Sequence, residues 1–156
     1  MSRASVWLAA FWWGSLTTLG FGVVPLLFWH LPTPALAGGM AARLFSAQTW
    51  VAAVCGLLLL LLMARQDRTA SGAGYAHSAR ENEENTDFSL VPYAKSAIIF
   101  VVSGILLAFL AEFIVAPRIV ARENLKLWHA VGSAMYLLQW VCAGAVLWKL
   151  TDRRQV

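Results

Sequence analysis

Five side chains that could carry chemistry lie at or near the ends of long apolar stretches of this sequence. They are His30, Arg43, Glu112, Arg118 and His129. A carboxylate can pair with a guanidinium, move a proton or bind a cation, and an imidazole can carry a proton or ligate a haem iron or copper ion. What these groups can do depends on whether the apolar stretches bring them together.

Glu112 is the acid among them, and it lies inside an apolar stretch. A charged side chain in hydrocarbon costs about 2.5–3.5 kcal/mol on insertion scales, so we expect Glu112 either to face inward toward a partner or to be protonated. Arg43, Arg118 and His129 are the candidate partners, and we predict a polar cluster of these four residues. Such a cluster could fix helix register, serve permeation of a small solute or ion, or dock a partner.

His129, with or without His30, is also a candidate cofactor ligand. A haem- or copper-binding redox protein is therefore an alternative function, with Met40 and Met135 as sources of the sulfur that copper prefers. The spacing assigns no metal site, because two histidines on different helices form no motif of the H-E-x-x-H kind. The stretches also hold no Ser/His/Asp set, phosphate-binding glycine loop or carboxylate pair, so we expect a non-enzymatic protein.

The composition excludes an ordinary water-soluble domain. The 156 residues are 60% hydrophobic and 13% charged, with a mean hydropathy of +0.65, whereas soluble domains have about 25% charged residues. The net charge of +4 comes from residues that flank apolar runs, a pattern typical of membrane topology signals, so we expect no nucleic-acid partner. Cys55 and Cys142 lie inside apolar runs and are expected to be buried thiols.

Four stretches are long enough to cross a bilayer at ~1.5 Å per helical residue. They cover residues 6–29, 44–64, 96–117 and 127–148. Because lipid cannot satisfy free backbone groups, each must be helical, and the predicted fold is an all-α integral membrane four-helix bundle. Residues 65–91 hold serine, glycine and an acidic cluster, and we expect them to form a flexible cytoplasmic loop.

The distribution of lysine and arginine predicts the orientation. One side of the membrane would hold eight of these residues: Arg3, Arg65, Arg68, Arg80, Lys95, Lys149, Arg153 and Arg154. The other would hold four: Arg43, Arg118, Arg122 and Lys126. Positive loops stay inside, so both termini are expected in the cytoplasm and the candidate residues at the other face.

Small residues at spacing four predict the packing faces of the helices. The expected stripes are Gly14, Thr18 and Gly22; Gln48, Ala52 and Gly56; Gly104, Ala108 and Glu112; and His129, Ser133, Tyr136, Trp140 and Ala143. Similar short motifs around Pro25 and Pro117 suggest two repeated helical hairpins. A second copy of the chain or another membrane protein could also cover one of these faces.

Several of these motifs together resemble an uncharacterised bacterial membrane family. The motifs are Trp13-Gly14, Pro25, Leu44-Phe45, Pro117-Arg118, and His129 followed by Ser133. That family is similar to transmembrane protein 205, and more distantly to copper-resistance D-type proteins and a haem-linked protoporphyrinogen oxidase. The resemblance implies a four-helix protein of the bacterial inner membrane without an established activity. It also implies a bias toward copper or haem, carried here by His30 and His129.

Overall fold

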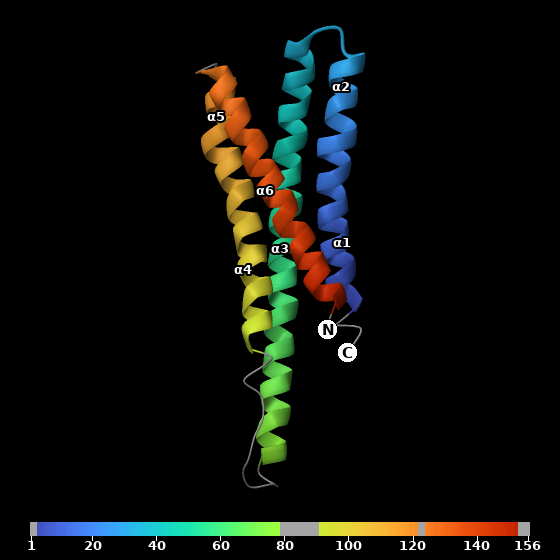
Figure 1. Cartoon of the computed structure of the whole chain (residues 1–156), viewed down its shortest axis with the longest axis vertical. Coiled ribbons are helices and arrows are strands. Elements are labelled where there is room, and N and C mark those ends of the chain that lie inside the picture. The colour runs from blue at the N-terminus through green and yellow to red at the C-terminus, as the bar shows by residue number, and fades with distance from the viewer. Residues whose placement is uncertain (1–2, 79–90, 122–123, 153–156) are drawn as a thin grey trace.

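The chain forms four long helical rods in the computed structural model, which describes residues 3–78, 91–121 and 124–152 (Figure 1). This confirms the all-α four-helix membrane bundle. By length and composition, four segments could cross a membrane: Arg3–His30, Pro34–Gln66, Ser96–Val120 and Leu125–Asp152.

Two of the rods change helix type along their length. The first consists of α1 (Arg3–Thr17), a π-helical turn η1 (Thr18–Val23) and α2 (Val24–His30). The second is the single helix α3 (Pro34–Ser78), and the fourth is α6 (Leu125–Asp152). The third consists of α4 (Val91–Leu110), a second π-helical turn η2 (Ala111–Val115) and α5 (Ala116–Val120).

Helix α3 begins at Pro34, before the expected start of the second span at Leu44. The Thr33 hydroxyl accepts a hydrogen bond from the Leu36 amide at 3.3 Å, and the Thr33 carbonyl accepts one from Ala37 at 3.1 Å. Proline suits the first position of a helix, where its missing N–H has no intrahelical partner to lose. Pro34 thus occupies the first position of α3.

Helix α3 also continues to Ser78, beyond the expected end of the second span at Ala64. The backbone of residues 65–78 is therefore helical, where a loop over 65–91 was expected, and residues 79–90 lie outside the described part of the chain. Adding one residue to an existing helix orders the backbone of that residue alone and gains one hydrogen bond, whereas starting a new helix orders several residues for its first bond. Polar residues can therefore prolong a long apolar helix.

The four rods form two antiparallel hairpins (Figure 1). Both termini lie at one end of the bundle, here called the terminal end, and the short α2–α3 and α5–α6 connections lie at the other, the loop end. Helix α6 crosses the bundle obliquely, from beside α5 at the loop end to beside α1 at the terminal end. The helices are consequently most closely packed in the terminal half.

Close packing in that half depends on glycines facing large side chains. A Cβ at Gly104 of α4 would lie 2.6 Å from Trp12 Cη2, and the Trp12 side chain is fully buried. The predicted stripes on the second and third spans are confirmed, since Ala52 and Ala108 are also buried. The remaining fully buried large side chains, Leu16, Leu59, Val101, Val146 and Leu150, complete this core.

The predicted stripe on the first span, by contrast, does not pack against another helix of this chain. A Cβ at Gly14 or Gly22 would have no neighbouring atom within 4 Å, and Thr18 is exposed. Helix α1 instead packs through the face that carries Ala9 and Trp12, both fully buried. A tryptophan on a facing glycine buries far more surface than a small residue can, and this contact selects the face.

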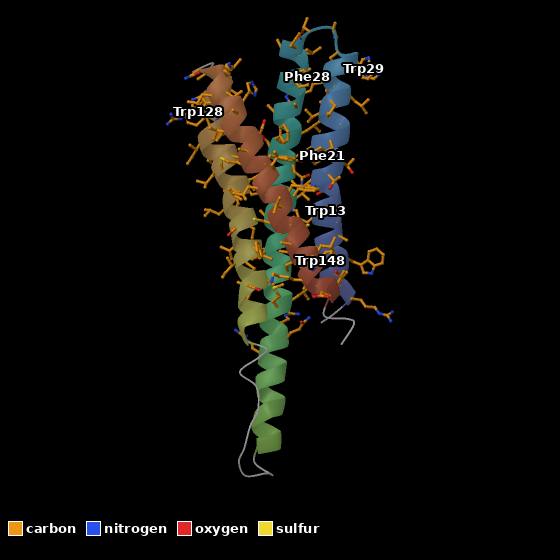
Figure 2. All side chains as sticks on the ribbon, in the orientation of Figure 1. Trp13, Phe21, Phe28, Trp29, Trp128 and Trp148 are labelled. Atoms are coloured by element: carbon orange, nitrogen blue, oxygen red, sulfur yellow. The ribbon has the colours of Figure 1, made fainter. Side chains whose placement is uncertain are left out.

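The outer surface of the bundle is apolar and carries tryptophans near both ends. Trp29 and Trp128 lie near the loop end, and Trp148 lies toward the terminal end (Figure 2). Trp29 and Trp148 are 85% and 72% exposed, as expected for side chains at the two membrane interfaces. The expected burial of Cys55 and Cys142 is confirmed, and both thiols are free.

Candidate functional site

Each π-helical turn lies directly before a proline in the loop half of the bundle. The amide of Val24 donates a hydrogen bond to the carbonyl of Leu19, five residues earlier. The amide of Ala116 donates to the carbonyl of Ala111 with the same spacing. Pro25 and Pro117 follow one residue later and bring no amide of their own. A proline ring clashes with the carbonyl four residues earlier, and widening the turn relieves this clash.

The π-turns border a half-open cavity of about 490 Å³ between the four rods. Gly20 and Phe21 line it from η1, and Ala111, Glu112 and Val115 line it from η2. Its volume falls in the range of small-molecule pockets, about 300–1,000 Å³. Its polar lining residues are Gln48, Thr49, Glu112, His129, Ser133, Tyr136 and Gln139.

The cavity has its mouth in the loop half and its floor near the middle of the bundle. Phe28 and Val120 line it near the loop end and are 50% and 74% exposed. Gln48, Ala108 and Gln139 line it at depth and are 8%, 2% and 4% exposed. Figure 2 shows Phe28 and Phe21 in the loop half of the first rod, which is the half that borders the cavity.

Hydrogen bonds between helices hold the floor of the cavity. The Tyr136 hydroxyl donates to the Leu16 carbonyl at 2.6 Å, and its ring lies so close to Gly20 that a Cβ there would come within 2.5 Å of Cε1. Gln48 Nε2 donates to Ser15 Oγ at 2.9 Å. These bonds tie α3 and α6 to the first rod at the level where the cavity ends.

A second pair of contacts lies just beneath Tyr136. Trp140 Nε1 donates to Thr17 Oγ1 at 2.8 Å, and the Trp140 ring lies 5.5 Å from the Trp13 ring between centroids. The Phe45 ring meets Tyr136 edge to face at 5.2 Å between centroids. The floor is therefore aromatic, and most of its polar atoms are already paired within the protein.

Glu112 is the acidic residue in the lining, and its partner is a serine. Ser46 Oγ of α3 donates to Glu112 Oε1 at 2.7 Å, across to η2. Because Ser46 uses its hydroxyl hydrogen in this bond, it orients the carboxyl group without neutralising it. Among the residues that the structure describes, no ion pair joins Glu112 to Arg43, Arg118 or His129.

Gln139 lines the cavity but carries a buried amide donor. Its side chain is 4% exposed, and its Nε2 atom has no hydrogen-bond partner within the described structure. A buried amide donor without a partner costs about 1–3 kcal/mol. Because Nε2 is buried, a molecule in the cavity does not reach it unless the side chain moves.

The predicted site residues fall into two groups. Glu112 and His129 line the same cavity. Arg43, Arg118 and His30 are exposed and are not among its lining residues. The Arg118 guanidinium lies over the Trp128 ring, 4.6 Å from its centroid, and His30 Nδ1 lies 3.0 Å from the Leu26 carbonyl of its own helix.

The residues considered as haem or copper ligands also do not all line one cavity. Met40 and Met135 do not line the cavity that His129 lines. Among the side chains that the structure describes, no group of three or more His, Cys, Asp or Glu residues that could hold a metal ion comes together. The arrangement offers one imidazole at the mouth and a carboxyl group deeper in the lining.

The sequence interpretation missed several residues of this site. Ser46 gave no signal, since a serine near the start of a span is common and neutral. Gln48 was predicted only as part of a packing stripe and Gln139 was given no role, although an amide in mid-span must find a partner or a cavity. Gly20 was overlooked because only the tertiary structure places Tyr136 against it.

The comparisons agree with this picture of a membrane protein without an assigned activity. Neither the curated proteins nor the solved structures include a match to the chain. Residues 7–127 match the family described as Domain of unknown function (DUF4149), and because this match covers more than half of the chain, the protein belongs to that family.

Proposed function

We propose that this protein binds a small, mostly apolar solute in the cavity between its helices. The volume of about 490 Å³ and the aromatic side chains of Phe21, Phe45 and Tyr136 support this proposal. Ligand sites are typically concave and apolar, with a few polar groups that orient the ligand. Glu112 is such a group here.

The observation that carries the proposal is the Glu112 carboxyl group in the wall of this mostly apolar cavity, where Ser46 donates to one of its two oxygens. Gln48 and Tyr136 on the floor are satisfied within the protein, by Ser15 and by the Leu16 carbonyl. The cavity thus has space for a solute and a polar group that can orient it.

The charge distribution supports a cavity that opens away from the cytoplasm. The termini and most lysine and arginine residues belong to one side, and positive segments stay inside. The cavity mouth lies at the opposite, loop end. The solute would enter from the non-cytoplasmic side or from the outer half of the bilayer.

Packing below the floor favours binding over an open permeation path. Trp12, Leu59, Val101 and Val146 are fully buried there, and a Cβ at Gly104 would collide with Trp12. Interiors packed to this degree leave no room for a solute. Passage toward the cytoplasm would require the helices to move apart.

Two neighbouring glycines of α3 allow a matched test. Gly38 lines the cavity and Gly39 does not, and a Cβ at either position would have no atom within 4 Å. Both Gly38→Trp and Gly39→Trp should therefore fold, but only the first should place an indole in the cavity. The probe is 1-adamantanol, a compact neutral molecule.

Binding of radiolabelled 1-adamantanol is measured in nanodiscs of zwitterionic lipid, with empty nanodiscs as the blank. We expect saturable binding that Gly38→Trp weakens at least tenfold and Gly39→Trp leaves unchanged. Absence of saturable binding, or equal loss in both variants, would refute a solute site in this cavity.

A haem- or copper-binding protein remains the alternative, and the resemblance to copper-resistance D-type proteins remains a hypothesis with it. His129 in the cavity lining is the residue that supports this alternative. The absorbance spectrum and metal content of purified protein distinguish the two functions. A Soret band or stoichiometric copper that His129→Ala removes would favour the alternative. A purely structural subunit would show neither a cofactor nor solute binding.

A further inference from the structure

We propose that the solute is a lipophilic amine that is bound in its ammonium form with its charge at Glu112. This inference rests on the proposed function, because it names the chemical class that the same cavity selects. It follows from the charge, the hydrogen-bonding capacity and the shape of the described lining.

Charge is the first argument. Among the described lining residues, Glu112 is the acid, and no lysine or arginine is included. The nearby cations are directed elsewhere, with Arg118 over the Trp128 ring and Arg43 exposed outside the lining. His129 and Ser133 face the cavity from α6 nearer the mouth. The interior of the cavity therefore attracts a cation and disfavours an anion.

Hydrogen-bonding capacity is the second argument. A carboxylate has about four lone-pair sites, and Ser46 occupies one at Oε1. An ammonium group brings donors and no acceptor, so it complements the sites that remain. A carboxylate or phosphate solute would instead place acceptors against acceptors. Ser46 holds the carboxyl group in position for this contact.

Shape is the third argument. Apolar side chains form most of the wall, including the rings of Phe21, Phe28 and Phe45 and that of Tyr136. Aromatic faces attract a cation as well as hydrocarbon, and the attraction grows when water is excluded. A compact hydrocarbon body with one ammonium group fits such a wall, whereas a bare metal ion would leave most of it uncovered.

The arginines at the loop end do not oppose this selectivity. They lie outside the cavity, and salt at physiological strength screens exposed charges beyond about 8 Å. An apolar amine can also enter from the lipid. Selection between charges therefore takes place inside, at Glu112.

Three probes with the same hydrocarbon body test the inference: 1-adamantylamine, 1-adamantanol and 1-adamantanecarboxylate. An alkylamine is charged at neutral pH, as lysine is. In zwitterionic nanodiscs carrying the wild-type protein, we expect the amine to bind at least tenfold more tightly than the alcohol, and the carboxylate more weakly than the alcohol. This order requires no variant and does not depend on how variants fold.

Variants then assign the preference to one carboxyl group. Glu112→Gln should remove the preference for the amine over the alcohol, and Glu112→Asp should retain part of it. Asp152→Asn is the matched control, because Asp152 is an exposed acid at the terminal end of α6. If Gly38→Trp weakens binding of the alcohol while the amine binds no more tightly than the alcohol, the solute site stands and the amine class is refuted. If none of the three probes binds, both proposals fail.

Discussion

Glu112 and Ser46 are joined by a 2.7 Å hydrogen bond that links η2 to α3 at the wall of the cavity. Arg43, Arg118 and His129 were the expected partners of Glu112, and the hydroxyl of Ser46 takes their place. A hydroxyl donor orients the carboxyl group without pairing it with a cation, which suits a binding site better than a structural ion pair.

Removing this hydrogen bond should weaken the bundle only moderately. Hydrogen bonds between membrane helices average about 0.6 kcal/mol and rarely exceed 1.7 kcal/mol. We expect Ser46→Ala to lower the free energy of unfolding by about 1 kcal/mol, measured by unfolding in mixed micelles with sodium dodecyl sulfate. Ser133→Ala, at an exposed lining position, is the control and should have little effect. Equal losses in the two variants would contradict a specific contribution from Ser46.

Gln139 and Gln48 should respond in opposite directions to the same substitution. Both side chains are buried, but Gln48 Nε2 bonds to Ser15 and Gln139 Nε2 is unpartnered. We expect Gln139→Leu to leave the unfolding free energy of the empty protein unchanged or to raise it by up to about 1–3 kcal/mol, because an unpaired buried donor is removed. Gln48→Leu should lower it by about 1 kcal/mol. The same unfolding measurement compares them, and a clear loss in Gln139→Leu would indicate a partner for Nε2.

Gly104 and Gly14 provide a test of which face of α1 is buried. A Cβ at Gly104 would meet Trp12 Cη2 at 2.6 Å, while a Cβ at Gly14 would meet nothing. We expect Gly104→Ala to cost about 1–3 kcal/mol of unfolding free energy through overpacking, and Gly14→Ala to change it by less than about 0.5 kcal/mol. Destabilisation by Gly14→Ala in a single-chain assay would mean that the small-residue stripe is buried after all.

Pro117 should control the shape of the cavity rather than the stability of the fold. Pro117→Ala restores an amide donor and removes the clash with the Phe113 carbonyl, so the π-turn can close to a regular helix. We expect solute binding to weaken because Glu112 rotates relative to α3, while thermal stability is kept or raised. Pro34→Ala, at the first position of α3, is the control for loss of a proline. Unchanged binding in Pro117→Ala would show that the π-turn does not position Glu112.

Labelling of engineered cysteines should report the orientation. Cys55 and Cys142 are buried, so a membrane-impermeant maleimide should not reach them. We expect His30→Cys and His129→Cys to react from outside intact cells, and Asp152→Cys only after the membrane is opened. Labelling of positions 30 and 129 from opposite sides would contradict the two-hairpin arrangement.

Much of the architecture was predictable because hydrocarbon imposes few and strict rules. A stretch long enough to cross the bilayer must be helical, and four such stretches with short connections at one end must form two hairpins. Trp29 and Trp148 lie near opposite ends of the bundle, as this reasoning requires of tryptophans at the two membrane interfaces. The likeness of the hairpins around Pro25 and Pro117 extends to the backbone, since each proline follows a π-turn.

The facing of individual side chains was less predictable, because an apolar residue is as stable against lipid as against another helix. Gly14, Thr18 and Gly22 had the spacing of an interface, yet Trp12 on Gly104 determined which face of α1 is buried. The sequence by itself determined that the chain spans the membrane four times and that its few ionisable groups gather near the ends of the spans. Only the tertiary structure decided that Glu112 lies beside Ser46 in a cavity, because this depends on how four rods with π-turns pack together.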